Sequence, residues 1–245
     1  MKPSEKVKHI SNWILNYVNS MPKKAESLVI GISGGIDSSV SSTLSALTGL
    51  KTIVLSMPIN QIKSQHDLSI KHQEWLVKNF KNVKAHTINL DNLFNSFKTT
   101  LSDFDNEHGL ANSRARLRMA TLYQVASSNN GIVVGTGNKV EDFGVGFYTK
   151  YGDGGVDISP IADCNKTEVW EIGKELKILD EIIKAEPTDG LWDDGRTDTG
   201  QLGLKYNELE EAMNNPNSEN REKYEKIRKL NLHKMESIPV CKIPN

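Results

Sequence analysis

Short apolar runs alternate with longer amphipathic segments along the first half of the chain. The apolar runs at residues 28–32, 52–57 and 131–136 predict strands, and residues 83–90 predict a further strand. Apolar residues recur at helical spacing in the segments between and around them, at residues 4–19, 37–48, 64–80, 91–101 and 111–127. Strands that alternate with helices predict right-handed crossovers and parallel pairing. We therefore expect an α/β fold, a doubly wound, mostly parallel sheet with helices on both faces.

The pattern changes after residue 136. The stretch GFYTKYGDGGVDISP (146–160) is rich in glycine and aromatic residues, and helical patterns return only at 165–184 and 206–230. Residues 185–203 hold four glycines and one proline and are too long for an ordinary connection, which indicates a lid or a disordered segment. We expect a single domain over 1–245, with a core at about 25–180, a mobile lid at about 185–203 and a helical C-terminal segment at about 205–245.

Charge and composition exclude several classes of protein. The 30 basic and 31 acidic side chains leave a net charge of −1, which does not indicate a broad surface for long nucleic acids. Two distant cysteines, Cys164 and Cys241, disfavour a zinc site or a disulfide framework and fit a reducing compartment. No apolar run has the length of a membrane span, and the N-terminus lacks the pattern of a signal peptide. The sequence predicts a cytoplasmic protein with no nucleic-acid or membrane partner.

The stretch SLVIGISGGIDSSVSS (27–42) places small polar residues at the end of a predicted strand. In open parallel sheets, ligands bind beyond the carboxyl ends of the strands, and a glycine turn that opens a helix exposes N–H groups to an anion. The hydroxyls of Ser33, Ser38 and Ser39 would add donors. Asp37 would repel bare phosphate but can share a Mg²⁺ ion with it. The loop therefore predicts a magnesium–pyrophosphate site, although a purely structural glycine turn with a Ser/Asp cap stays open.

Two other nucleotide motifs fit less well. A Walker A loop needs a lysine that this loop lacks. Gly135 and Gly137 follow a predicted strand, with Asp157 about twenty residues on, as in a Rossmann fingerprint. However, Val140 stands where the third glycine belongs, so we reject that interpretation.

The string SGGIDSS (33–39) resembles the signature of the PP-loop ATP pyrophosphatases, which implies attack at the α-phosphorus of ATP and release of pyrophosphate. That signature does not distinguish among the members of the superfamily. Further strings occur in the order typical of the ammonia-dependent NAD synthetases, and this resemblance runs nearly end to end. The strings are ARLRM (115–119), GTGNKVE (135–141), TKYGDGG (149–155), EPT (186–188) and HK (233–234).

The family resemblance implies a set of site residues. Those expected to bind ATP are Gly31, Ile32, Ser33, Gly34, Gly35, Ile36, Asp37, Ser38, Thr136, Lys166 and Thr188. Those expected to bind deamido-NAD are Arg116, Lys150, Asp157, His233 and Lys234, the last two across a dimer interface. Asp37 and Glu141 would hold Mg²⁺. Asp153 and Lys166 would be catalytic, with Asp153 holding ammonium or taking its proton.

The same resemblance implies an activity. The nicotinate carboxylate of deamido-NAD would attack ATP, and ammonia would then displace AMP from the adenylate to give NAD. The PP-loop begins near residue 31, which leaves no room for an upstream amidase domain, so we expect free ammonia as donor unless a separate glutaminase subunit supplies it. The alternatives are another PP-loop adenylating enzyme, such as a tRNA-modifying or GMP-synthetase-like amidotransferase, and a nucleotide-binding protein without turnover.

The sequence departs from the family pattern in two places. Ser56 follows the second predicted strand where the family often has an arginine and a run of acids, so contacts to the adenine or ribose are not assigned there. Thr199 and Gln201 stand in the lid where acids are expected. We assign no catalytic residue between 193 and 201.

Overall fold

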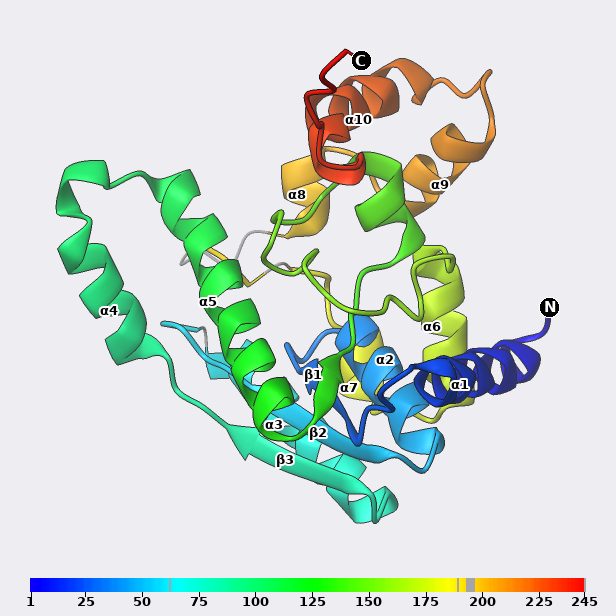
Figure 1. Ribbon diagram of the computed structural model, residues 1–245. Helices are drawn as coiled ribbons and strands as arrows, with labels where there is room; N and C mark the ends of the chain where they lie inside the picture. The colour runs from blue at the N-terminus through cyan, green and yellow to red at the C-terminus, as the bar shows by residue number, and fades with distance from the viewer. Residues whose placement is uncertain (62, 189, 193–196, 245) are drawn as a thin grey trace.

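The computed structural model of the chain describes residues 1–61, 63–188, 190–192 and 197–244. Four strands and a series of helices follow one another along the chain (Figure 1). The strands are β1 (Ser27–Gly31), β2 (Lys51–Ser56), β3 (Val83–Thr87) and β4 (Gly131–Val133). The helices of the first half are α1 (Pro3–Ser20), α2 (Ile36–Leu47), α3 (Lys63–Asn79), α4 (Asp91–Thr100), the short η1 (Ser102–Phe104) and α5 (Glu107–Ser128). Those of the second half are η2 (Lys139–Val145), α6 (Lys166–Glu175), α7 (Asp180–Lys184), α8 (Asp198–Leu202), α9 (Tyr206–Asn214) and α10 (Arg221–Met235).

The four described strands form one parallel sheet in the order β3-β2-β1-β4. β1 lies inside the sheet, with Ile30 opposite Val54 of β2 and Leu28 opposite Ile132 of β4. An isolated parallel bridge between Val134 and Ile158 continues the edge beyond β4. This topology confirms the predicted doubly wound α/β fold, and it sets the carboxyl ends of β1 and β4 beside each other.

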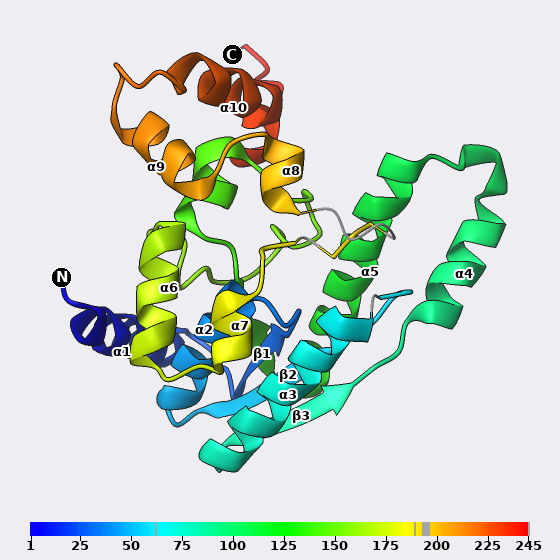
Figure 2. The ribbon, with the colours of Figure 1, turned by 180° about the vertical axis from the view of Figure 1, so that it is seen from behind.

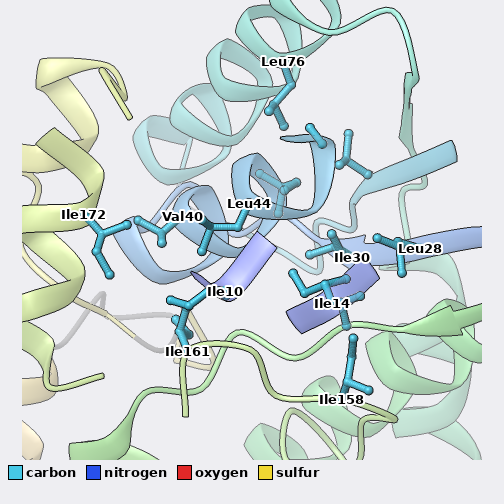
Figure 3. Close-up of a cluster of buried hydrophobic side chains, with 14 of the residues drawn as sticks. Ile10, Ile14, Leu28, Ile30, Val40, Leu44, Leu76, Ile158, Ile161 and Ile172 are labelled. Carbon is cyan, nitrogen blue, oxygen red and sulfur yellow. The ribbon is translucent and has the colours of Figure 1, made fainter. Parts of the chain in front are cut away.

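Alternate residues of the strands pack into two separate hydrophobic layers. Leu28 and Ile30 face a layer filled by α1, α2, α3 and α6, where Ile14 and Leu44 are fully buried (Figure 3). Val29 faces the opposite layer, which α5 and the start of α4 cover. Figure 2 shows α3, α6 and α7 on the side away from α5. Helices thus cover both faces of the central strands β1 and β2, and the strand ends are the expected place for a ligand.

The C-terminal helices α8, α9 and α10 gather around η2 at one end of the molecule (Figure 1). They share a small core of their own, formed by Val140, Val145, Leu202, Leu204, Tyr206, Leu209, Ala212 and Tyr224. The expected continuous helix over 206–230 is wrong, because α9 ends at Asn214 and Pro216 lies in the connection. The expected helix over 165–184 is also divided, since the chain leaves helical geometry at Lys177, whose φ is +56°.

Residues 139–145 form a π-helix, η2, that the sequence patterns do not predict. Its first N–H groups are capped by the side chain of Asn138, which accepts from Val140 and Glu141 at 3.0 and 3.1 Å. It ends at Gly146, whose φ is +66° and whose N–H donates to the Glu141 carbonyl. Short π-helical turns in proteins are frequent at functional sites, and this one carries a predicted metal ligand, Glu141.

One buried histidine makes the stability of the fold depend on pH. His72 is fully buried on α3, where its Nε2 lies 3.0 Å from the Ser42 hydroxyl, and burial lowers its pKa to about 4. The unfolded chain takes up a proton near pH 6.5 whereas the folded chain does not, so the free energy of unfolding should fall as the pH falls from about 6.5 to about 4, by up to about 3 kcal/mol.

Urea unfolding between pH 4 and pH 7 checks this prediction. His72→Gln, which keeps a polar partner for Ser42 without a titrating ring, should lose most of the decline below pH 6.5. His9→Gln changes an exposed histidine and should keep the wild-type pH profile. An equal decline in wild type and His72→Gln would contradict the prediction.

Candidate active site

The connection between β1 and α2 is a tight loop stabilised by its own serines. Gly34 adopts a φ of +92°, which disfavours side chains at this position. The Ser33 hydroxyl accepts the N–H of Gly35 at 3.1 Å and lies 3.1 Å from the Ser38 hydroxyl, which in turn accepts the N–H of Ser33 at 3.2 Å. These bonds hold the loop in shape without a ligand.

The start of α2 provides donors for an anion. The hydrogen bond from Ser39 N–H to Gly35 O, at 3.2 Å, is the first turn of the helix, so the N–H groups of Ile36, Asp37 and Ser38 come before any intrahelical bond. They lie at the positive end of the helix dipole. The hydroxyls of Ser38 and Ser39 both donate to Gly35 O, at 3.1 and 2.9 Å, and of the two residues Ser38 lines the cavity described below whereas Ser39 does not.

A cavity of about 240 Å³ opens at the carboxyl ends of β1 and β4. Nearly all the residues predicted for ATP, metal and catalysis line it, Gly34 excepted. They are Gly31, Ile32, Ser33, Gly35, Ile36, Asp37, Ser38, Thr136, Glu141, Asp153, Lys166 and Thr188. The chain therefore brings residues from five separate segments to one cavity.

A buried cation joins two of these segments. The Lys166 ammonium lies 2.5 Å from Asp37 Oδ2 and 2.9 Å from Glu141 Oε1, and its side chain is 2 % exposed. The lysine is the first residue of α6, whereas Asp37 lies in the first turn of α2 and Glu141 in η2. The ammonium also lies 4.7 Å from the centre of the Tyr206 ring. This cation therefore pairs with both carboxylates inside the protein.

Two neutral side chains complete the hydrogen bonding of the carboxylates. Asn138 donates to Asp37 Oδ1 at 3.1 Å. The Tyr206 hydroxyl lies 2.5 Å from Glu141 Oε1 and 2.9 Å from Asp198 Oδ2. Tyr206 thus connects the cluster to α8, within the predicted lid.

Burial and charge oppose each other in this cluster. Burial alone would lower the pKa of Lys166, but the two carboxylates outweigh it and raise that pKa, so the amine stays charged. Burial raises the pKa of Asp37 despite the lysine. For Glu141 the same burial is outweighed by Lys166 and by the Tyr206 hydroxyl, and its pKa is lowered. Glu141 is therefore the more firmly ionised of the two acids.

The residues predicted for deamido-NAD lie outside the cavity, and four of them form a chain of contacts beside it. Arg116 Nε donates to the Lys150 carbonyl at 3.2 Å, and Lys150 Nζ donates to the His233 carbonyl at 3.0 Å. Lys234 Nζ donates to the Tyr148 carbonyl at 2.8 Å. His233 and Lys234 therefore reach the TKYGDGG segment of their own chain.

Asp157, the fifth residue of that set, has a structural role. Its Oδ2 accepts the N–H of Val133 at 2.7 Å and its Oδ1 accepts the Tyr123 hydroxyl at 3.1 Å. These bonds tie the chain after the GDGG turn to β4. Burial, together with the charge of Asp157, raises the pKa of Tyr123 to about 12, so this tyrosine stays neutral.

Two further acids, Asp153 and Asp142, line the cavity. Asp153 Oδ1 accepts the N–H of Thr149 at 3.0 Å, which holds the GDGG turn. Asp142, which the sequence analysis did not select, also lines the cavity, and burial raises its pKa well above the ordinary range, with the charges of Glu141 and Asp153 adding to the effect. Lys234 is the basic residue that opposes this shift, and burial lowers its own pKa.

Two arginines of α5 hold the first part of the predicted lid. Arg114 is buried, and it donates to the Leu191 carbonyl at 2.6 Å. Arg118 lines the cavity and donates to the Met57 carbonyl at 3.0 Å and to the Gly190 carbonyl at 3.5 Å. Residues 189 and 193–196 of the lid lie outside the described residues.

Several side chains of the site were not predicted from the sequence. Asp198 lines the cavity although no catalytic residue was assigned between 193 and 201. Arg118 lies in the ARLRM string (115–119), but no role was assigned to it. Tyr206 looks like an ordinary apolar position of α9, and only the fold places its hydroxyl at Glu141. Ser56, where adenine contacts were left unassigned, lines the cavity with its hydroxyl 2.8 Å from that of Ser69.

Comparison with known families identifies relatives over the whole chain. Residues 6–244 match the family model described as NAD synthase. The NH(3)-dependent NAD(+) synthetase of Methanosarcina acetivorans is 36% identical over 208 residues, which is 82% of this chain and 79% of that protein. The enzyme of the same name from Mesoplasma florum is 37% identical over 237 residues, 93% of this chain and 94% of that protein.

Solved structures show the same fold. The NMN synthetase of Francisella tularensis superimposes with a TM-score of 0.89 at 32% identity, covering 100% of this chain and 99% of that one. The NH3-dependent NAD synthetase of Campylobacter jejuni superimposes with a TM-score of 0.78 at 22% identity, covering 99% and 100%. The second likeness concerns the fold alone.

Proposed function

Since the chain belongs to the NAD synthase family, as its resemblance to the ammonia-dependent members predicted, we propose that it is a C–N bond-forming ligase. It amidates deamido-NAD with ammonia and ATP, giving NAD, AMP and pyrophosphate, the last step of NAD synthesis. The observation that supports this best is the buried Lys166 between Asp37 and Glu141, at the mouth of a loop suited to pyrophosphate. A binding protein without turnover does not need that arrangement.

In the first step, an oxygen of the nicotinate carboxylate attacks the α-phosphorus, and the bond from that phosphorus to pyrophosphate breaks. The N–H groups at the start of α2 receive the charge that develops on the leaving pyrophosphate. Lys166 lies where it can turn from the carboxylates to the phosphate chain. No protein nucleophile is needed, because the substrate supplies its own carboxylate and orientation in the cavity accounts for much of the rate.

The donors in the site fit Mg²⁺. Asp37 and Glu141 offer hard carboxylate oxygens on one cation, and in the part of the chain that the structure describes no third acidic, histidine or cysteine side chain joins them in a metal-holding group. Asp37 and Glu141 would hold the ion while phosphate oxygens and water complete its shell. When bound, Mg²⁺ supplies charge that stabilises the leaving pyrophosphate.

In the second step, ammonia attacks the carbonyl carbon of the adenylate and AMP leaves. The nitrogen must shed a proton as the amide forms. In this proposal the Asp153 carboxylate, at the wall of the cavity, takes that proton or holds ammonium beforehand. Deamido-NAD extends toward Arg116, Lys150 and Lys234, whose charges suit its diphosphate.

The lid protects the adenylate from water, and Arg114 holds its first part against α5. Arg114→Met keeps an unbranched side chain at this buried position but removes the guanidinium. That group lies 4.7 Å from the centre of the Phe94 ring and donates a charged hydrogen bond to Leu191, which is worth about 1.5–3 kcal/mol. We expect the KM for ATP to rise about tenfold and AMP to be released in excess of amide.

Measuring AMP and amide in the same samples shows whether AMP is released in excess of amide. Arg221→Met, which removes an arginine of α10 that contacts the end of α9 and is not among the cavity-lining residues, should keep a ratio of one AMP per amide. Equal amounts of AMP and amide from Arg114→Met at low ammonium would contradict a protective lid.

The proposed function is tested by mixing the protein with Mg-ATP, ammonium and deamido-NAD. NAD, AMP and pyrophosphate should appear in equal amounts, and each should depend on all three substrates. Formation of ADP in place of AMP, or the absence of turnover with every nicotinate nucleotide, would overturn the proposal.

Synthesis of NMN is a second candidate. It is favoured by the likeness over the full chain to the Francisella tularensis NMN synthetase, at 32% identity. By the same amidation chemistry the acid substrate would be nicotinic acid mononucleotide, which carries the same carboxylate and lacks only the AMP half of deamido-NAD. A kcat/KM for the mononucleotide above that for deamido-NAD would select this candidate, and the reverse would select NAD synthesis.

Two properties stay predictions at this point. We propose a homodimer and a cytoplasmic location by analogy with the family. None of the helices in the described part of the chain is long and apolar enough to cross a bilayer. Light scattering of the purified protein, with and without ATP, measures the oligomeric state directly.

A further inference from the structure

The ammonium of Lys166 contacts one oxygen of each of the two carboxylates that are proposed to hold the metal ion. Its Nζ lies 2.5 Å from Asp37 Oδ2 and 2.9 Å from Glu141 Oε1. Oxygen ligands of Mg²⁺ lie about 2.0–2.1 Å from the ion, so the ion must sit between the same two carboxylates. An ammonium and a divalent cation this close to each other would repel strongly. Lys166 in this position therefore strongly disfavours a metal ion bound to both carboxylates.

The surroundings of Lys166 stabilise the state without metal. The side chain is 2 % exposed, and the Tyr206 ring faces the ammonium at 4.7 Å. Burying Asp37 and Glu141 together without a cation would be costly, and the lysine supplies that cation. The raised pKa of Lys166 agrees with a permanently charged amine.

The carboxylate pair alone is a poor metal site. Within the described ranges, no group of three metal-binding side chains occurs, so a divalent ion would need most of its ligands from elsewhere. A triphosphate at the loop supplies such oxygens and also gives the displaced ammonium a new anionic partner. A metal ion that arrives without nucleotide brings no anion to which the Lys166 ammonium could move.

We propose that Lys166 is an internal counter-ion that keeps the divalent metal out of the empty site and releases the carboxylates only when ATP arrives with its metal. Metal and nucleotide then bind as one unit. Lys166 moves from Asp37 and Glu141 to the phosphates in the same event. The ammonium that pairs with the carboxylates before ATP binds therefore contacts the phosphates afterwards. This inference rests on the metal role proposed for Asp37 and Glu141, but not on which nicotinate nucleotide is amidated.

Binding of Mn²⁺, used as a paramagnetic probe in place of Mg²⁺, tests the inference without catalysis. The electron paramagnetic resonance signal of free Mn²⁺ is measured as wild type, Lys166→Met and Lys166→Arg are added without nucleotide. Wild type and Lys166→Arg should bind weakly. Lys166→Met, which exposes an uncompensated carboxylate pair, should bind at least tenfold more tightly. Lys71→Met removes a surface lysine paired with Glu181 and should behave as wild type.

A second measurement uses the wild-type protein alone. With a non-hydrolysable ATP analogue, Mn²⁺ should bind at least 30-fold more tightly than to the protein alone, after correction for binding to the free analogue. If Lys166→Met folds only in the presence of Mn²⁺, its tight binding of the metal is measured instead from the rise of its melting temperature with Mn²⁺ concentration.

Two results would overturn the inference: equal Mn²⁺ affinity of wild type and Lys166→Met without nucleotide, or wild-type affinity that the analogue does not change. Neither assay contains ammonia or an acid substrate. Failure here and failure of the proposed amidation are therefore distinguishable.

Discussion

Asp37→Asn is expected to lower kcat/KM for amidation by about 10³-fold. The amide keeps the shape of the side chain and can still accept the hydrogen bond from Asn138. It removes the charge that faces Lys166 and one of the two proposed metal ligands, so pyrophosphate loses part of its preorganised stabilisation. Steady-state release of AMP and of amide should fall together, because the loss precedes adenylate formation.

The matched control is Asp163→Asn, which changes an acid that pairs with Lys139 on the surface and lies outside the cavity lining. Its activity should equal that of wild type. Thermal unfolding of Asp37→Asn shows whether the variant is still folded. We expect that it is, because Glu141 still pairs with Lys166. If Asp37→Asn keeps more than about a tenth of the wild-type activity, a metal or phosphate role for Asp37 is excluded.

The second large effect is expected at Asp153, which also lines the cavity. Asp153→Asn should leave adenylate formation intact and slow the ammonia step by about 10²-fold, which is the contribution typical of a proton-transfer group. The asparagine oxygen can still accept the Thr149 N–H, so the GDGG turn should survive. Rapid-quench analysis of a single turnover should show a normal burst of pyrophosphate followed by delayed amide.

Asp180→Asn, in an exposed pair with Lys184, provides the control and should show no delay. Limiting ammonium makes the comparison most sensitive, because the second step then controls the rate. Wild-type amidation by Asp153→Asn under that condition would remove Asp153 from the ammonia step, whereas loss of the pyrophosphate burst would move its role to the first step.

The sheet and the loop at its edge were predictable from local patterns. Apolar runs of five or six residues are typical of buried parallel strands, and β1, β2 and β4 form largely within such runs. The fourth strand, β3, is largely exposed and has a mixed sequence. The position of SGGIDSS after such a run placed the anion site at a strand end, where the cavity lies. Both predictions depend on residues that are neighbours in the sequence.

The remaining features depend on contacts between distant segments. Lys166 was expected near ATP by resemblance, but its position between Asp37 and Glu141 requires α2, η2 and α6 to be packed together. The helix break at Lys177 falls at neither a glycine nor a proline, so the sequence gives no sign of it. The left-handed conformation of Lys177 is stabilised by a hydrogen bond from the N–H of Ile178 to Gly173 O at 3.1 Å. Pro216 did mark the break between α9 and α10 and was overlooked.

The π-helical turn of η2 constrains the length of this segment as well as its composition. Each residue of an α-helix is rotated about 100° from the one before it, so deleting a single residue between Asn138 and Gly146 would restore ordinary helical winding and swing Glu141 away from Lys166. Phe143 is 53 % exposed and should tolerate replacement by many side chains, but not removal. Insertions and deletions should therefore be harmful here even at positions where any amino acid is accepted, and protein engineers should treat 138–146 as a segment of fixed length.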